Sequence, residues 1–169
     1  ELKTIAVLSV ELGGDTDLAE QVDPSSLMEL ERARLRWFRQ LARRYGGLLQ
    51  PGPDDTVTII FGAPRTRQDD LERALRCALE LRSIVEDADW NQANSSLCVG
   101  VNLGQAAVQH AGGNTVTQVV GRGSTFRLAR RLAGHGELGE VLVSPVVAQQ
   151  AEDGFTFEPA PPLPYRTQR

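Results

Sequence analysis

Short apolar strand segments alternate with long amphipathic segments in this chain, and their order limits the folds it can adopt. Residues 4–11 form an apolar run typical of a buried strand, and the segment from Pro24 to Tyr45 repeats apolar residues at helical spacing. Asp23 before Pro24 and Gly46 after Tyr45 are common start and stop signals of a helix. The first 46 residues are therefore predicted to form a strand followed by a long helix.

A hairpin and a second long helix are predicted next. Leu48–Gln50 and Thr56–Phe61 are apolar runs on either side of a turn, residues 51–55, which is rich in Pro, Gly and Asp. Residues 69–86 again repeat apolar side chains at helical spacing. The remaining segments predict strands at 97–103, 105–109, 116–120 and 140–143, and short helices at 124–132 and 145–150.

This order of elements predicts an α+β fold. A ferredoxin-like βαββαβ core is expected, with a C-terminal β-α-β extension and with the helices on one face of a mainly antiparallel sheet. At 169 residues the chain fits one domain, which we expect to span residues 1–159. Residues 160–169 begin with three prolines in five positions and are predicted to be an extended exit or linker.

Composition narrows the partners that this domain can have. The net charge is −4, and the basic residues are scattered among acidic ones along the sequence, so neither nucleic acid nor a membrane surface is an expected partner. The chain has no apolar run of about 18 residues and no signal peptide. We expect a cytoplasmic domain of a longer protein, either free or as the soluble part of a membrane-anchored one. Cys77 and Cys98 are expected to be buried, reduced thiols.

Two acidic residues mark the candidate chemistry. Glu11 ends the first predicted strand, and Asp55 opens the strand that follows the turn. Carboxylates are the ligands that hard divalent cations need. From the residues alone, the pair is either a cation site or an acidic strand end beside an ordinary Asp turn.

Several motifs give this chain a family resemblance. The segment from Gly123 to Leu132 matches the pattern Gly-x-x-Val-Asn-x-Ala-x-Arg-Leu, and supporting matches occur at residues 61–64, 69–76, 99–104 and 139–144. Together they make residues 3–159 resemble the catalytic domain of class III nucleotidyl cyclases, the adenylate and guanylate cyclase family. The resemblance implies Mg²⁺ or Mn²⁺ as cofactor, a nucleotide ligand, and a homodimer or heterodimer with active sites across its interface.

The resemblance assigns Glu11 and Asp55 to the metal site. The family has Asp at both positions, so Asp55 is unchanged while Glu11 keeps the charge on a longer side chain. Mg²⁺ tolerates little error in ligand distance, which is about 2.1 Å. Metal binding is therefore predicted to be weak or absent.

The remaining site positions depart further from the family. Pro51 stands where the family has its purine-reading lysine, and Val120 stands at the second base-reading position. Arg127 replaces the Asn that orients the ribose, whereas Arg131 matches the Arg that stabilises the phosphate transition state. Lys3 is the only lysine of the chain, and it is too distant in sequence register to replace the missing one.

These substitutions favour a degenerate cyclase domain. Loss of one preorganised group typically costs roughly two to three orders of magnitude in rate, and three groups are missing. We therefore expect a catalytically impaired signalling or dimerisation module of a larger protein. One alternative is a divergent but active cyclase that converts ATP or GTP to the cyclic nucleotide. A second is a chain that is active only in a heterodimer, to which it contributes Arg131, and a third is a pocket reused to bind another nucleotide without turnover.

Overall fold

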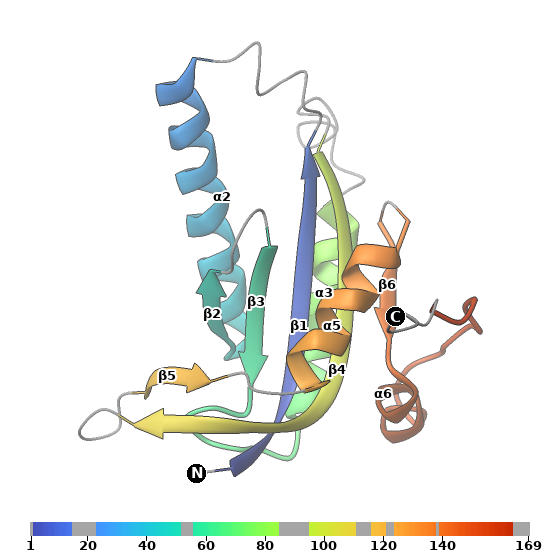
Figure 1. Ribbon diagram of the computed structural model, residues 1–169. Helices are drawn as coiled ribbons and strands as arrows, with labels where there is room; N and C mark the ends of the chain where they lie inside the picture. The colour runs from blue at the N-terminus through green and yellow to red at the C-terminus, as the bar shows by residue number, and fades with distance from the viewer. Residues whose placement is uncertain are drawn as a thin grey trace, which may run out of the picture.

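A six-stranded sheet organises the chain (Figure 1). The computed structural model describes residues 2–14, 23–51, 56–84, 95–110, 116–120, 124–137 and 139–163. The strands are β1 (Leu2–Gly14), β2 (Leu48–Pro51), β3 (Thr56–Phe61), β4 (Ser95–His110), β5 (Val116–Val120) and β6 (Val141–Val143). The helices are α2 (Pro24–Tyr45), α3 (Asp70–Ile84), α5 (Ser124–His135) and α6 (Pro145–Gln150).

The strand order confirms the predicted α+β, ferredoxin-like core. The strands lie in the order β2-β3-β1-β4-β5 with antiparallel pairing throughout, and β6 adds to β4 in parallel. The first βαββαβ unit contains β1 to β4, and β5, α5 and β6 form the predicted extension. Among the described helices, none is both long and apolar enough to cross a lipid bilayer.

The start and stop signals in the sequence correctly predict both ends of α2. Pro24 occupies the first turn of the helix, where a missing N–H costs nothing. Gly46 adopts a left-handed conformation with φ of 75°, and its N–H bonds to the carbonyls of Ala42 and Arg43. Glycine adopts this conformation without the steric cost that a Cβ would bring, so it ends the helix.

Two details of the strand prediction were wrong. Residues 97–103 and 105–109 belong to one long strand, β4, which passes through Gly104 without interruption. The first strand, predicted at residues 4–11, is longer, because β1 runs from Leu2 to Gly14, where it pairs with Ser95.

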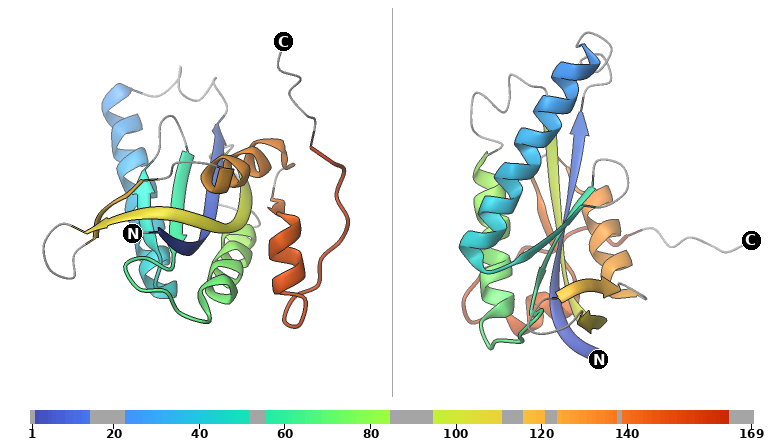
Figure 2. Two further views of the ribbon diagram at one scale, coloured as in Figure 1. Left: turned by 60° about the horizontal axis from the view of Figure 1, so that its bottom comes forward. Right: turned by 90° about the vertical axis from the view of Figure 1, so that its left-hand side faces the viewer.

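The helices cover both faces of the sheet, and the prediction that they share one face was wrong (Figure 2). On one face, α2 and α3 enclose the main core with side chains such as Leu8, Phe38 and Leu81. On the other face, α5 packs against Ile5, Val7 and neighbours in a second, smaller core. The run from Ile5 to Val10 is apolar almost throughout because both of its faces are buried.

The C-terminal segment after α6 forms neither helix nor strand through residue 163. Phe155 and Phe157 in this segment pack against the main core. The prediction of a linker that begins at residue 160 stays a prediction, since residues 164–169 lie outside the described part of the chain.

Candidate active site

Glu11 lies in the centre of the sheet, near the end of β1. It pairs with Thr56 on β3 and with Cys98 on β4, so these three side chains share one face. Glu11 is half-buried, and its Oε2 lies 3.0 Å from the position that a Cβ would take on Gly134. The carboxylate therefore lies against the last turn of α5, on the face of the sheet that α5 covers.

The second predicted carboxylate, Asp55, lies outside the described residues. It is bonded directly to Thr56, the residue that pairs with Glu11. The metal site built from the two carboxylates stays a prediction. Within the described residues, no three His, Cys, Asp or Glu side chains are grouped to hold a metal ion.

The two arginines of the candidate site are on α5. Its buried residues, Thr125, Ala129, Leu132 and Ala133, form one stripe against the sheet. At 3.6 residues per turn, Arg127 and Arg131 lie more than about 120° around the helix from the centre of that stripe. Arg127 is exposed and Arg131 is partly exposed. Both arginines thus stem from the outward side of α5, where a second subunit could meet them.

The substituted base-reading positions lie on two different strands. Pro51 is the last residue of β2 and pairs with Val57, and Val120 is the last residue of β5 and pairs with Ala107. The only lysine, Lys3, is at the opposite end of β1 from Glu11, about 26 Å away along the strand. Its Nζ donates a hydrogen bond to the carbonyl of Pro64.

Two glycines of β4 let α5 approach the sheet closely. A Cβ on Gly100 would lie 2.1 Å from the carbonyl oxygen of Ala129, and one on Gly104 would lie 2.5 Å from Oγ1 of Thr125. Asn102, between these glycines, donates from Nδ2 to the carbonyl of Thr125 at 3.0 Å. Thr125 Oγ1 donates in turn to the carbonyl of Gln105 at 2.8 Å. These contacts fix α5, and with it the two arginines, relative to Glu11.

Cys98 is a neighbour of Glu11 that the sequence did not reveal as part of the site. Its Sγ donates to the carbonyls of Gly136 and Glu137, at 3.1 and 2.8 Å. Burial raises the pKa of this thiol, and the nearby carboxylates of Glu11 and Glu140 raise it further. Contrary to the prediction of two buried thiols, Cys98 is only half-buried. Cys77 is fully buried as predicted, and both are free.

Alkylation of Cys98 should report on the charge of Glu11. We expect Glu11→Gln to lower the pKa of Cys98 and to raise its rate of reaction with iodoacetamide at pH 8 by about threefold, because the thiolate is the nucleophile. Mass spectrometry of labelled peptides gives the rate. Cys77 is an internal control, since burial raises its pKa to about 12 and it should not react in the folded chain.

A matched substitution tests whether the effect is local. Glu152→Gln removes the same charge from an exposed turn after α6 and should leave the alkylation rate unchanged. Equal rates in wild type and Glu11→Gln would contradict the placement of the carboxylate beside the thiol.

The fold and the sequence both match a known family of domains. Residues 1–166 match the family model described as adenylate and guanylate cyclase catalytic domain. The chain belongs to this family.

Individual relatives include both adenylate and guanylate cyclases. Adenylate cyclase 1 of Rhizobium meliloti (strain 1021) is 26% identical over 151 residues, which are 85% of this chain and 23% of the relative. The chain thus spans about a quarter of that protein. The adenylyl cyclase CyaB from P. aeruginosa has a solved structure with 25% identity and a TM-score of 0.77, over 91% of this chain and 83% of that one.

A fungal guanylate cyclase domain shares the fold at lower identity. The domain of RhGC from Catenaria anguillulae, solved in complex with GTP, has 18% identity and a TM-score of 0.78. The match covers 92% of this chain and 86% of that one. At this level of identity the likeness concerns the fold alone.

Proposed function

We propose that this chain is a catalytically impaired cyclase domain that acts in signalling or dimerisation within a larger protein. The observation that carries the proposal is the lack of an amine donor near β2. Pro51 ends that strand without a side-chain donor, and the only lysine bonds to Pro64 near the far end of β1. A purine base bound beside β2 would therefore lack the lysine contact that the family uses.

The apolar Val120 and the altered Arg127 add to this loss. A hydrophobic side chain cannot replace a lost hydrogen bond to a base edge, and a guanidinium has donors but no acceptor. A site built to read hydrogen bonds discriminates strongly, so the loss of its donors removes both affinity and selectivity. What remains are a carboxylate at Glu11, a second at Asp55, and two arginines suited to phosphate.

A divalent cation would be held by Glu11 and Asp55. Their oxygen donors suit Mg²⁺ or Mn²⁺, and a bound ion would supply charge neutralisation on the phosphates. Glu11 also contacts the end of α5 and neighbours a thiol, which is a poor donor for these hard ions. We expect weak binding at most.

A cyclase assay tests the proposed lack of activity. Purified protein incubated with ATP or GTP and Mn²⁺ is expected to form no cyclic AMP or cyclic GMP above a no-enzyme blank, as measured by mass spectrometry. Thermal shifts with a nucleotide panel show whether the site binds without turnover, because a ligand of the folded state raises its stability. Cyclic nucleotide formation that Arg131→Ala abolishes would overturn the proposal.

A divergent, active cyclase is the second candidate. It is favoured by the pairing of Glu11 with Thr56, which brings the residue next to Asp55 beside the first carboxylate. It is also favoured by the position of both arginines on the outward side of α5, which suits a site completed by a partner. If Asp55→Ala or Arg131→Ala left a detected activity unchanged, this candidate would fail.

Dimerisation has precedents among proteins of the same fold. A guanylyl cyclase domain from Blastocladiella emersonii is described as a non-canonical dimer, at 18% identity and a TM-score of 0.80, over 95% of this chain and 91% of that one. For this chain we propose a cytoplasmic homodimer or heterodimer. In a heterodimer, Arg131 would serve carboxylates of the partner. Co-expression with a family member that has both Asp residues, followed by gel filtration and assay, tests that arrangement.

A further inference from the structure

Four arginines form a continuous stripe along α2. Arg32, Arg36, Arg39 and Arg43 are spaced by four, three and four residues, which places them on one side of a helix. All four are exposed. With a rise of 1.5 Å per residue, this arginine stripe runs for about 16 Å. Its centre lies about 140° around the helix from the buried line of Phe38, Leu41 and Ala42, so the stripe is on the outward side of α2.

Helix α2 concentrates positive charge in an otherwise acidic chain. It contains six arginines and two glutamates, a net charge of +4, whereas the whole chain carries −4. The sequence outside α2 therefore carries −8. The expectation that the basic residues are scattered among acidic ones does not hold for this helix.

The arginine stripe has no partner in the described part of the chain. None of its four members forms an ion pair there, while the neighbouring Arg44 pairs with Glu80 on α3. The other acidic residues of α3 are already paired, since Glu72 binds Arg76 and Asp70 binds Arg73. A second copy of this chain would therefore offer few free carboxylates on its described helices.

The site of the stripe is open to a partner. The N-terminal half of α2 rises beyond the ends of β2 and β3 (Figure 1). The helix packs on the face of the sheet opposite α5, so α2 and the two arginines of the candidate site lie on opposite sides of the sheet (Figure 2).

The chemistry of the stripe favours carboxylates on a protein over other anions. A membrane-binding helix needs an apolar face free to insert, and the apolar residues of α2 between Leu35 and Tyr45, alongside most of the stripe, are used in the core. A nucleic-acid surface usually combines basic residues with exposed aromatics and a basic domain, whereas Trp37 is half-buried and the chain is acidic. The guanidinium group of arginine binds carboxylates in a bidentate manner. A helix with acidic residues at the same spacing would place a carboxylate opposite each of the four arginines.

We propose that the arginine stripe of α2 is a docking surface for an acidic α-helical segment of another protein. The partner presents carboxylates about one helical turn apart, and the two helices lie side by side along some 16 Å. This surface is independent of nucleotide binding, so it can hold whether or not the proposed function does.

A designed peptide tests the proposal on the whole chain. The probe is a fluorescent helical peptide of about 18 residues with glutamates at i, i+4, i+7 and i+11, and its control has glutamine at those positions. Anisotropy at about 0.15 M salt is expected to show binding of the glutamate peptide only. Arg36→Gln with Arg39→Gln should weaken that binding about fivefold or more, while glutamine preserves the helix.

A matched variant and two competing ligands decide the outcome. Arg65→Gln with Arg82→Gln removes the same charge from exposed positions outside α2 and should leave the affinity unchanged. Equal weakening by both double variants, or no binding by wild type, would overturn the proposal. Tighter binding to single-stranded DNA or to phosphatidylserine vesicles, lost in the stripe variant, would also overturn it and assign the stripe to that ligand.

Discussion

Replacing Gly100 with valine is expected to lift α5 from the sheet and to reduce the free energy of unfolding by about 3 kcal/mol or more. A Cβ at this position would lie 2.1 Å from the carbonyl oxygen of Ala129 and 2.7 Å from the amide nitrogen of Ala133. Both are backbone atoms, so no rotation of a side chain can relieve the contact. Valine otherwise favours strands, and the loss would therefore come from the clash with α5.

Thermal unfolding measures this effect. For a domain of this size, about 3 kcal/mol corresponds to a decrease in Tm of roughly 6–12 °C. Gly154→Val is the control, because a Cβ there would meet no atom within 4 Å. A Gly100→Val variant as stable as this control would contradict the packing of α5 against β4.

The same glycines explain where the strand prediction failed. Gly104 resembles a strand break in the sequence, yet β4 passes through it. Glycine is needed at this position because a Cβ would meet Thr125 of α5. Glycine within a strand often marks such a close approach. A sequence read alone does not distinguish this from a break, since the partner helix lies some 20 residues later.

The apolar sequence of β1 already indicated that helices cover both faces of the sheet, contrary to the prediction of helices on one face. A run from Ile5 to Val10 with a single polar member, Ser9, indicates a strand covered on both faces. Helices on one face only would have left Ile5 and Val7 to solvent. The order of the elements was predictable, whereas the face on which α5 packs required this additional inference.

The candidate site was predictable only where it depends on position along a strand. Glu11 ends an apolar run, and its place at the centre of the sheet follows from the strand order of the core. Cys98 lies beside Glu11 because of the register of β1 against β4, and Gly134 lies there because of where α5 packs on the sheet. Local sequence does not specify register between strands about 85 residues apart, so Cys98 could not be assigned to the site.

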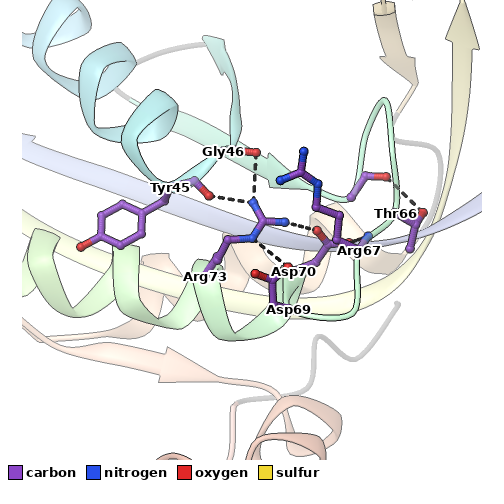
Figure 3. A network of polar contacts seen from close by, with 8 residues as sticks. Tyr45, Gly46, Thr66, Arg67, Asp69, Asp70 and Arg73 are labelled. Atoms are coloured by element: carbon purple, nitrogen blue, oxygen red, sulfur yellow. Dashed lines mark hydrogen bonds and ion pairs between the residues drawn. The ribbon is translucent and has the colours of Figure 1, made fainter.

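A buried ion pair holds the C-terminus of α2 to the start of α3 (Figure 3). The guanidinium of Arg73 pairs with Asp70, which is 6% exposed, and with Asp69 at 3.2 Å. Its Nη1 also donates to the carbonyls of Tyr45 and Gly46, at 2.7 and 3.4 Å. Asp70 accepts a further hydrogen bond from the backbone N–H of Arg67 at 2.7 Å. One side chain thus satisfies a buried carboxylate and two carbonyls near the end of a helix.

Arg73→Ala is expected to reduce the free energy of unfolding by about 3–5 kcal/mol at pH 7, because it leaves the Asp70 carboxylate buried and unpaired. Burial already raises the pKa of Asp70, while the Arg67 N–H and the Arg73 charge oppose that rise. Without Arg73 the pKa rises further above its unfolded value, so the folded variant binds the proton more tightly and gains stability as the pH falls.

Urea unfolding of wild type and Arg73→Ala between about pH 4 and pH 7 separates this mechanism from simple loss of packing. The deficit of the variant should be largest at pH 7 and should shrink as the pH falls through the raised pKa of Asp70. Adding Asp70→Asn to Arg73→Ala removes the titrating group, so the double variant should lose that pH dependence. The loss in free energy of unfolding could instead be below about 1 kcal/mol, or equal at both ends of the pH range. Either result would mean that water solvates the Asp70 carboxylate in the variant and that its pairing with Arg73 contributes little to stability.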